Sequence, residues 1–317
     1  MAPSQLLRLL GITHPIIQAG MARQYTSAQL VAAVSESGAL GILGCLDRPA
    51  HEVVAEIRAI RALTDRPFGV NFVLHRLDAG AFEAALAERV PVFSFFRGDP
   101  TAAVARAHRA GAVTIHQVTT TQEALQAARA DADVIAAQGT EAGAHCGPLP
   151  LSALLPDVIR LIGDRPVIAA GGIVDGRGLA ASVAVGAAGV LMGTRFLATD
   201  EAPASPNHKR AILDAGPDST VASGRFDLLW EDNRWPGVRV RALKNRLAHF
   251  VATADDAHFA ASLEALRAEI AQAIDVDDPE RRPLLAGMGA SRIDTILPVH
   301  KVVEGMIAEA ETSIAAV

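Results

Sequence analysis

The stretch PVIAAGGIVDGRGLAASVAVGAAGVLMGTRF, residues 166–196, holds two apolar runs with glycines at their ends and an alanine-rich segment between them. The runs 166–172 and 189–196 have the length and composition of buried strands, and residues 178–185 have the apolar spacing of a helix. A strand, a helix and a second strand in this order form the repeating unit of a parallel sheet. This stretch therefore predicts an α/β fold.

The same unit recurs through the first 200 residues. Six further apolar runs are candidate strands, at 15–21, 39–45, 68–74, 90–96, 112–118 and 133–139. The candidate helices include 27–37, 51–63, 101–110, 121–130, 152–162 and 178–185, and three of them end in a glycine, at Gly38, Gly111 and Gly186. Eight such units close a (β/α)8 TIM barrel more readily than they form an open sheet, which remains the alternative because sequence does not reveal strand order.

The pattern changes after residue 200, where prolines interrupt the chain and helices are expected near 255–274 and 299–310. We expect no strand pairs there. Residues 1–200 are predicted to form the barrel core, and residues 201–317 a C-terminal helical cap packed on it within the same structural unit. The apolar helices of this extension either cover the barrel or form a contact in a homodimer.

Composition and charge exclude several classes of function. The formal net charge is 29 − 35 = −6, and no basic run is present that could neutralise a series of phosphates, so we expect no nucleic-acid partner. No apolar run approaches the roughly 18 residues of a membrane span, and residues 1–15 lack the pattern of a signal peptide. Two cysteines, Cys45 and Cys146, are too few for a disulfide framework, and no spacing resembles a metal site. A cytoplasmic protein with a small-molecule substrate is expected.

Two glycine turns follow the last two strands of the predicted barrel. The first contains Gly171 and Gly172, and the second contains Gly193 and Thr194. In such barrels the loops after strands seven and eight commonly bind phosphate through backbone N–H groups, and the Thr194 hydroxyl can donate a further hydrogen bond. Either turn alone could be a tight turn without a ligand, but together they predict a phosphorylated ligand. Arg195 either balances the negative charge of this ligand or packs on the outside of the barrel.

A glycine-rich loop with one histidine, AQGTEAGAHCGP (137–148), follows strand six. An imidazole titrates near neutrality, so His145 at this end of the barrel is the candidate general base. Gln138, at the strand end, can offer a donor and an acceptor to a ligand. Glu141 is expected to fix the loop, and Cys146 is not expected to act as a nucleophile because neighbouring side chains of an extended segment point apart.

Other strand ends add candidate ligand contacts. Met21 follows strand one, where it offers a pliable packing surface, and Asn71 is a polar side chain inside an apolar strand. His116 and Gln117 must face opposite sides of strand five, and the sequence does not say which of them points inward. The substrate side of the site is expected to depend on the extension, around residues 226–235 with their two tryptophans.

Six motifs occur in the order in which the nitronate monooxygenases carry them: PIIQAGMA, ALGILG, FGVNF, AQGTEAGAHCG, AAGGI and LMGTR. From residue 15 to about 199 the chain resembles this family of FMN-dependent barrels. The resemblance implies FMN contacts from Met21, Asn71, Gln138, Gly143, Gly172, Leu191, Met192, Gly193 and Thr194, to which the phosphate turn adds Gly171. It also makes His145 the base that takes the proton beside a nitro group, after which the flavin is reduced and O2 yields a carbonyl compound and nitrite.

The sequence departs from the family at the histidine loop, where Ala144 replaces a second glycine and Cys146 follows the histidine. These changes bear on the substrate side of the flavin. Two alternatives therefore stay open beside nitronate oxidation. One is an NAD(P)H-dependent FMN reductase of enoyl thioesters or quinones, which shares the barrel and the flavin site. The other is a flavin-free barrel that binds a phosphorylated ligand.

Overall fold

The computed structural model describes residues 4–230 and 238–316. Its eight parallel strands are β1 (Ile16–Gln18), β2 (Gly41–Gly44), β3 (Phe68–Val73), β4 (Val92–Phe96), β5 (Val113–Val118), β6 (Val134–Gln138), β8 (Val167–Ala170) and β9 (Gly189–Met192). They pair in the order β1-β9-β8-β6-β5-β4-β3-β2. The Gln18 N–H donates to the Leu40 carbonyl at 2.9 Å and joins β1 to the chain entering β2, so the sheet closes on itself. The predicted barrel is confirmed, and the open sheet is excluded.

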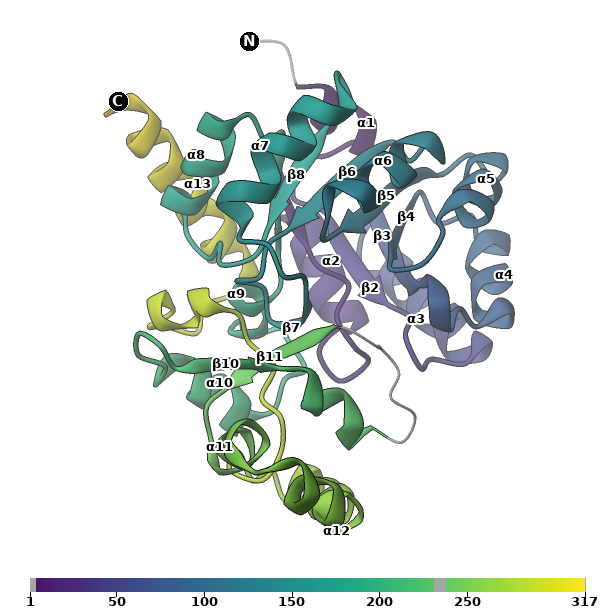
Figure 1. The fold of residues 1–317 in the computed structure, drawn as a ribbon. Coiled ribbons are helices and arrows are strands. Elements are labelled where there is room, and N and C mark those ends of the chain that lie inside the picture. The colour runs from purple at the N-terminus through teal and green to yellow at the C-terminus, as the bar shows by residue number, and fades with distance from the viewer. Residues whose placement is uncertain (1–3, 231–237, 317) are drawn as a thin grey trace.

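Helices surround the strands (Figure 1). They are α1 (Gln5–Leu10), α2 (Ala28–Glu36), α3 (Ala50–Leu63), α4 (Ala79–Ala87), α5 (Thr101–Arg109), α6 (Thr121–Arg129), α7 (Leu151–Ile162) and α8 (Gly176–Val185), with the short η1 (Leu74–Arg76) and α9 (Thr194–Leu197) after β3 and β9. Gly38, Gly111 and Gly186 have φ of +81°, +80° and +112°. These are the left-handed conformations expected where a glycine ends a helix.

Alternation along the strands separates two cores. In β5, Ile115 belongs to the apolar cluster inside the barrel, whereas Val118 packs toward the surrounding helices. Leu6 and Leu10 of α1 also belong to the inner cluster. Because Gln117 lies two residues from Ile115, it also points inward, and His116 points outward. Of the two side chains between which the sequence could not choose, Gln117 is therefore the one on the inner face of the barrel.

The extension contains strands as well as helices. Its elements are α10 (Pro206–Leu213), β10 (Thr220–Ser223), η2 (Gly224–Leu229), β11 (Arg239–Leu243), α11 (Arg246–Thr253), α12 (Asp256–Asp275), η3 (Met288–Arg292) and α13 (Val299–Ala315). β10 and β11 form an antiparallel sheet with β7 (Ala144–Cys146), which lies in the histidine loop. The expectation of no strand pairs after residue 200 was wrong, because these strands are short and one partner lies in the barrel half of the chain. Two roles follow for the extension: β11 holds the histidine loop, and α13 packs beside α8 and α2 in the outer ring of helices (Figure 1).

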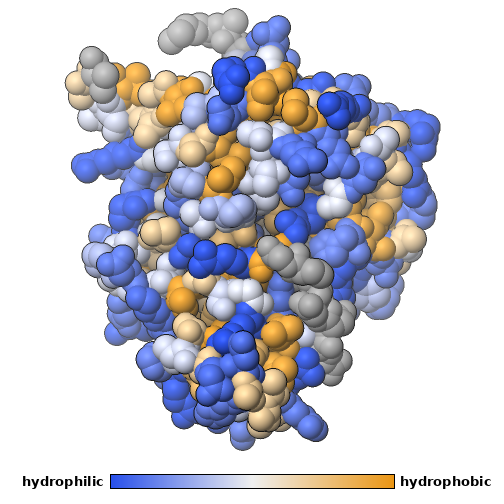
Figure 2. All heavy atoms as spheres, viewed as in Figure 1, coloured by the Kyte–Doolittle hydropathy of each residue, from blue (hydrophilic) through white to orange (hydrophobic). Residues whose placement is uncertain are grey.

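Polar and charged side chains cover most of the face in Figure 2, and the apolar residues lie in smaller separate areas. Among the described helices, none has the length and hydropathy needed to cross a membrane.

Two buried histidines make the stability of the fold sensitive to acid. Burial lowers the pKa of His116, on the outer face of β5, and of His208, in α10, to about 4. Below about pH 6.5 each histidine binds a proton in the unfolded chain but stays neutral in the folded protein. The free energy of unfolding therefore falls between about pH 6.5 and 4, by about 3 kcal/mol for each histidine. Denaturant unfolding at several pH values measures this loss, and His116→Leu should remove about half of it. A wild-type stability that stays level over this range would contradict the prediction.

Candidate active site

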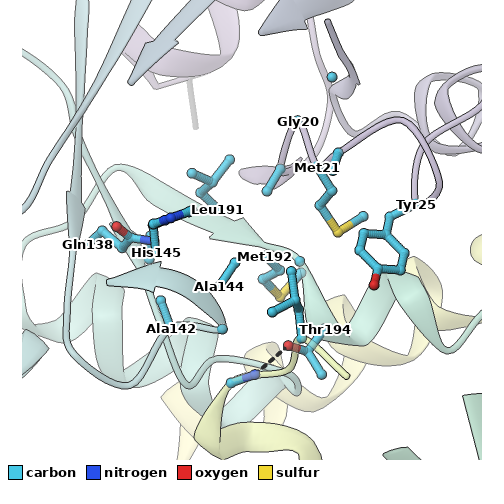
Figure 3. Close-up of a pocket in the computed structure, with 18 of the residues that line it drawn as sticks. Gly20, Met21, Tyr25, Gln138, Ala142, Ala144, His145, Leu191, Met192 and Thr194 are labelled. Atoms are coloured by element: carbon cyan, nitrogen blue, oxygen red, sulfur yellow. Dashed lines mark hydrogen bonds between the residues drawn. The ribbon is translucent and has the colours of Figure 1, made fainter. Parts of the chain in front are cut away.

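A cavity of about 300 Å³ lies at the carboxyl ends of the barrel strands. All eight strands or the turns directly after them contribute to its lining, which is where barrels of this kind place their active sites. The expected base and the expected FMN contacts all line this cavity: Met21, Asn71, Gln138, Gly143, His145, Gly171, Gly172, Leu191, Met192, Gly193 and Thr194. Figure 3 shows His145 and Gln138 on one side and Met21 and Tyr25 on the other. The fold thus brings together residues spread over more than 170 positions of sequence.

The two glycine turns differ in what they require of glycine. Gly171 and Gly172 have φ of +107° and +71°, values that favour glycine. Gly193 has a right-handed helical backbone conformation and precedes Thr194 at the start of α9. The extension covers both turns. The Gly287 N–H donates to the Thr194 hydroxyl at 2.9 Å (Figure 3), and the Arg292 guanidinium donates to the Gly172 carbonyl. The Thr194 hydroxyl keeps its own proton for a ligand oxygen.

Polar side chains on the inner face of the strands form the second part of the cavity. Asn71 is fixed by donating its amide to the Ser94 hydroxyl at 3.1 Å. Gln138 is buried, and its Oε1 has no hydrogen-bond partner in the part of the chain that the structure describes. Buried acceptors are rarely left unpaired in native proteins, so this oxygen indicates a ligand that donates to it. Gln117 adds a further inward amide beside them.

His145 lies on β7, opposite Val240 of β11. Its side chain is 17% exposed, and its Nε2 lies 2.8 Å from the Oδ1 of Asp227. The Trp230 ring lies beside it, with the ring centres 6.4 Å apart. A loop was expected here, but residues 144–146 form a strand because β11 supplies the partner. Asp227 was missed, since no spacing connects it to a histidine 82 positions earlier.

The other residues of the histidine loop have structural tasks. Both carboxylate oxygens of Glu141 accept the Leu151 N–H at the start of α7, at 3.1 Å, as expected for a residue that fixes the loop. Cys146 is buried with its thiol 3.6 Å from the Arg239 carbonyl, and burial raises its pKa. A buried thiol with a raised pKa is a poor nucleophile, in line with expectation. Ala144 adopts a φ of +57°, a conformation that favours glycine.

Residues of the extension also line the cavity: Trp230, Leu285, Gly287 and Gly289. The apolar Leu46, Val73 and Phe96 at the ends of β2 to β4 belong to the same lining. Trp230 is in the segment that was expected to shape the substrate side, and Trp235 of that segment lies outside the described residues. Among those that are described, no group of three His, Cys, Asp or Glu side chains is arranged to hold a metal ion.

Arg195 does not line the cavity. It is buried, and its guanidinium donates to the carbonyls of Ala198 and Thr295 at 2.6 and 2.7 Å. Of the two roles left open for this residue, packing on the barrel fits the structure. The guanidinium joins Ala198, directly after α9, to Thr295 in the segment that leads into α13. The cation that reaches the glycine turns is Arg292, which sequence reasoning did not single out.

Replacing Arg195 by methionine is expected to lower the free energy of unfolding by about 2–3 kcal/mol, because two buried carbonyls lose their donor. Urea denaturation measures this loss. Arg160→Met is the matched control: that side chain is 72% exposed and pairs with Asp157 on the surface, so its removal should cost under about 1 kcal/mol. Unchanged stability of Arg195→Met together with loss of ligand binding would instead make Arg195 a countercharge.

A closed barrel whose cavity joins two glycine turns, inward amides and a paired histidine at the carboxyl ends of its strands has the arrangement of a barrel enzyme. The model of the nitronate monooxygenase family matches residues 4–84 and 78–309. The chain belongs to this family.

Individual relatives carry different activities in their names. A (3aS,4S,5R,7aS)-5-hydroxy-7a-methyl-1-oxo-octahydro-1H-indene-4-carboxyl-CoA dehydrogenase of Mycobacterium tuberculosis is 43% identical, over 70% of this chain and 63% of that protein, so the match spans less than two thirds of the relative. A probable nitronate monooxygenase of Staphylococcus haemolyticus is 33% identical, over 70% of this chain and 75% of the relative.

Two solved structures cover nearly the whole chain. FabK from Thermotoga maritima superimposes with a TM-score of 0.89 at 34% identity, over 100% of this chain and 98% of that one. A nitroalkane oxidase from Streptomyces ansochromogenes gives 0.83 at 32% identity, over 99% of each chain. The family is thus shared by enzymes with several names, and the substrate has to be argued from the site.

Proposed function

We propose that the chain is an FMN-dependent nitronate monooxygenase, which oxidises alkyl nitronates and nitroalkanes with O2 to a carbonyl compound and nitrite. The observation that carries the proposal is the position of His145, which faces the same cavity as the two glycine turns and pairs with a buried carboxylate. A base held in this way can take a proton from a carbon acid next to a bound cofactor.

The residues of the cavity fit FMN. The positive φ of Gly171 and Gly172 and the start of α9 at Thr194 suit the phosphate, and the unpartnered Oε1 of Gln138 suits a donor on the flavin. Met21 offers an apolar surface to a planar ring. Bound there, FMN would supply the two-electron oxidation that no side chain can perform.

The protein's own residues would handle the proton and exclude water. His145 takes the proton beside the nitro group, and the apolar side chains at the ends of β2 to β4, with Trp230, shield the reacting carbon. Substrates that arrive as anionic nitronates need no such proton transfer.

A second function is favoured by the comparisons. The 43% identity to an enzyme named as a carboxyl-CoA dehydrogenase and the full-length likeness to FabK support the alternative of an acyl-thioester oxidoreductase. We propose NAD(P)H as the electron donor of such an enzyme. The two functions differ in the electron donor, since a monooxygenase takes electrons from its substrate and a reductase takes them from a pyridine nucleotide.

Anaerobic mixing separates these possibilities. The purified protein should be yellow and release FMN on denaturation, and an alkyl nitronate should bleach its flavin absorption while NADH and NADPH do not. Bleaching by NADH or NADPH alone would favour the reductase. A colourless protein that takes up no FMN would contradict both functions and leave the flavin-free phosphate-binding barrel.

A further inference from the structure

The partner of His145 comes from the extension, and its environment is unusual for a surface ion pair. Asp227 lies in η2 and is 1% exposed. Its Oδ1 meets His145 Nε2 at 2.8 Å, and its Oδ2 is buried without a hydrogen-bond partner among the described residues. Burying a carboxylate with one oxygen unsatisfied costs free energy. Such a cost is expected where the group serves a function rather than stability.

The fold fixes both members of the pair. β7 carries His145 and pairs with β11, and β11 packs against η2, so one small sheet sets the distance between the two side chains. On either side of Asp227, Phe226 and Leu229 are buried in an apolar cluster with residues of α11 and α12. Neither side chain of the pair therefore depends on a mobile surface contact for its position.

The pair has a chemical consequence for the ring. An imidazole that donates its Nε2–H to a carboxylate carries its lone pair on Nδ1, and the carboxylate stabilises the ring when it gains a proton. We propose that Asp227 is a positioning residue for His145: it selects the Nε2–H tautomer and so presents Nδ1 as the atom that takes the substrate proton. This inference rests on the proposed role of His145 as the base.

Asp227 does not line the cavity, so it would act only through His145. A purely structural pair would fasten the extension to the barrel and affect all substrates alike. A positioning residue would affect only those substrates from which a proton must be taken.

The kinetic test compares a neutral nitroalkane with its preformed nitronate. Asp227→Leu should lower kcat for the neutral nitroalkane by about 10²-fold, and for the nitronate by less than about threefold. Asp227→Asn keeps an acceptor oxygen and should recover part of the loss. Equal losses on both substrates would overturn the proposal and make the pair structural.

A matched control exists on the outside of the barrel. His108 Nε2 and Asp133 Oδ2 also lie 2.8 Å apart, and neither residue lines the cavity. Asp133→Asn therefore weakens a histidine–carboxylate pair of the same geometry and should change neither substrate's kcat.

A second measurement does not depend on turnover. Nitrogen-15 NMR of histidine-labelled holoprotein at mildly alkaline pH should show His145 as the Nε2–H tautomer, and Asp227→Leu should shift it to a mixture of both tautomers. The His145→Gln spectrum assigns the signal. An unchanged tautomer in Asp227→Leu would overturn the proposal. If wild-type protein oxidises no nitro compound, the proposed function fails, but this spectrum still decides what Asp227 does to the ring.

Discussion

His145→Ala is expected to lower the turnover of a neutral nitroalkane by about 10²–10⁴-fold, the usual contribution of a general base. The variant should still bind FMN, because the glycine turns and the inward amides lie on strands that the substitution does not touch. Turnover of the anionic nitronate should fall far less, since that substrate has already lost its proton. Steady-state kinetics on both substrates, with the flavin content measured by absorbance, check these expectations.

Asp47 supplies the comparison variant for this experiment. Among the described residues that line the cavity, Asp47 and His145 are the two that carry a carboxylate or an imidazole. The Asp47 side chain, however, is 52% exposed and forms an ion pair with Arg76 at 3.2 Å. Asp47→Asn should therefore lose much less activity than His145→Ala. Wild-type activity of His145→Ala on the neutral nitroalkane would rule out His145 as the base, and a large loss in Asp47→Asn would transfer that role to Asp47.

The barrel and the positions of its site residues followed from the sequence because both depend on local pattern. Each buried strand is a short apolar run, and the strand order closes as the repeated unit requires. Residues just after a strand must lie at one end of the barrel, so His145 and the glycine turns could be placed on the same face without knowing any contact.

Contacts between distant segments could not be predicted in this way. The strand of residues 144–146 exists only because β11 lies beside it, and three residues carry too little alternation to show a strand. Asp227 is one of many acidic residues until the fold places it behind His145. Likewise, the sequence left two roles for Arg195, and only the carbonyls of Ala198 and Thr295 decide between them.

Gly143→Ala is expected to weaken FMN binding at least tenfold, or about 1.4 kcal/mol, although it adds one methyl group. A Cβ at this position would lie 2.6 Å from the backbone of both Ala286 and Gly287, which is closer than atoms can approach. The segment must move outward, and the Gly287 N–H would then lose its bond to the Thr194 hydroxyl beside the phosphate turns. Overpacking of this kind should also lower the free energy of unfolding by about 1–3 kcal/mol. Fluorescence titration with FMN and thermal denaturation measure the two effects.

Gly305→Ala is the matched control, because the methyl group added there does not clash with a neighbouring segment. Apart from its chain neighbours and the backbone of its own helix α13, no heavy atom of the described residues lies within 4 Å of a Cβ at Gly305. Alanine is also favoured over glycine inside a helix by up to about 1 kcal/mol. The two variants should therefore change stability in opposite directions, and only Gly143→Ala should release FMN. If Gly143→Ala bound FMN as tightly as the wild type, the junction of the histidine loop with residues 286–287 would not be part of the cofactor site, and the extension would shape the substrate side alone.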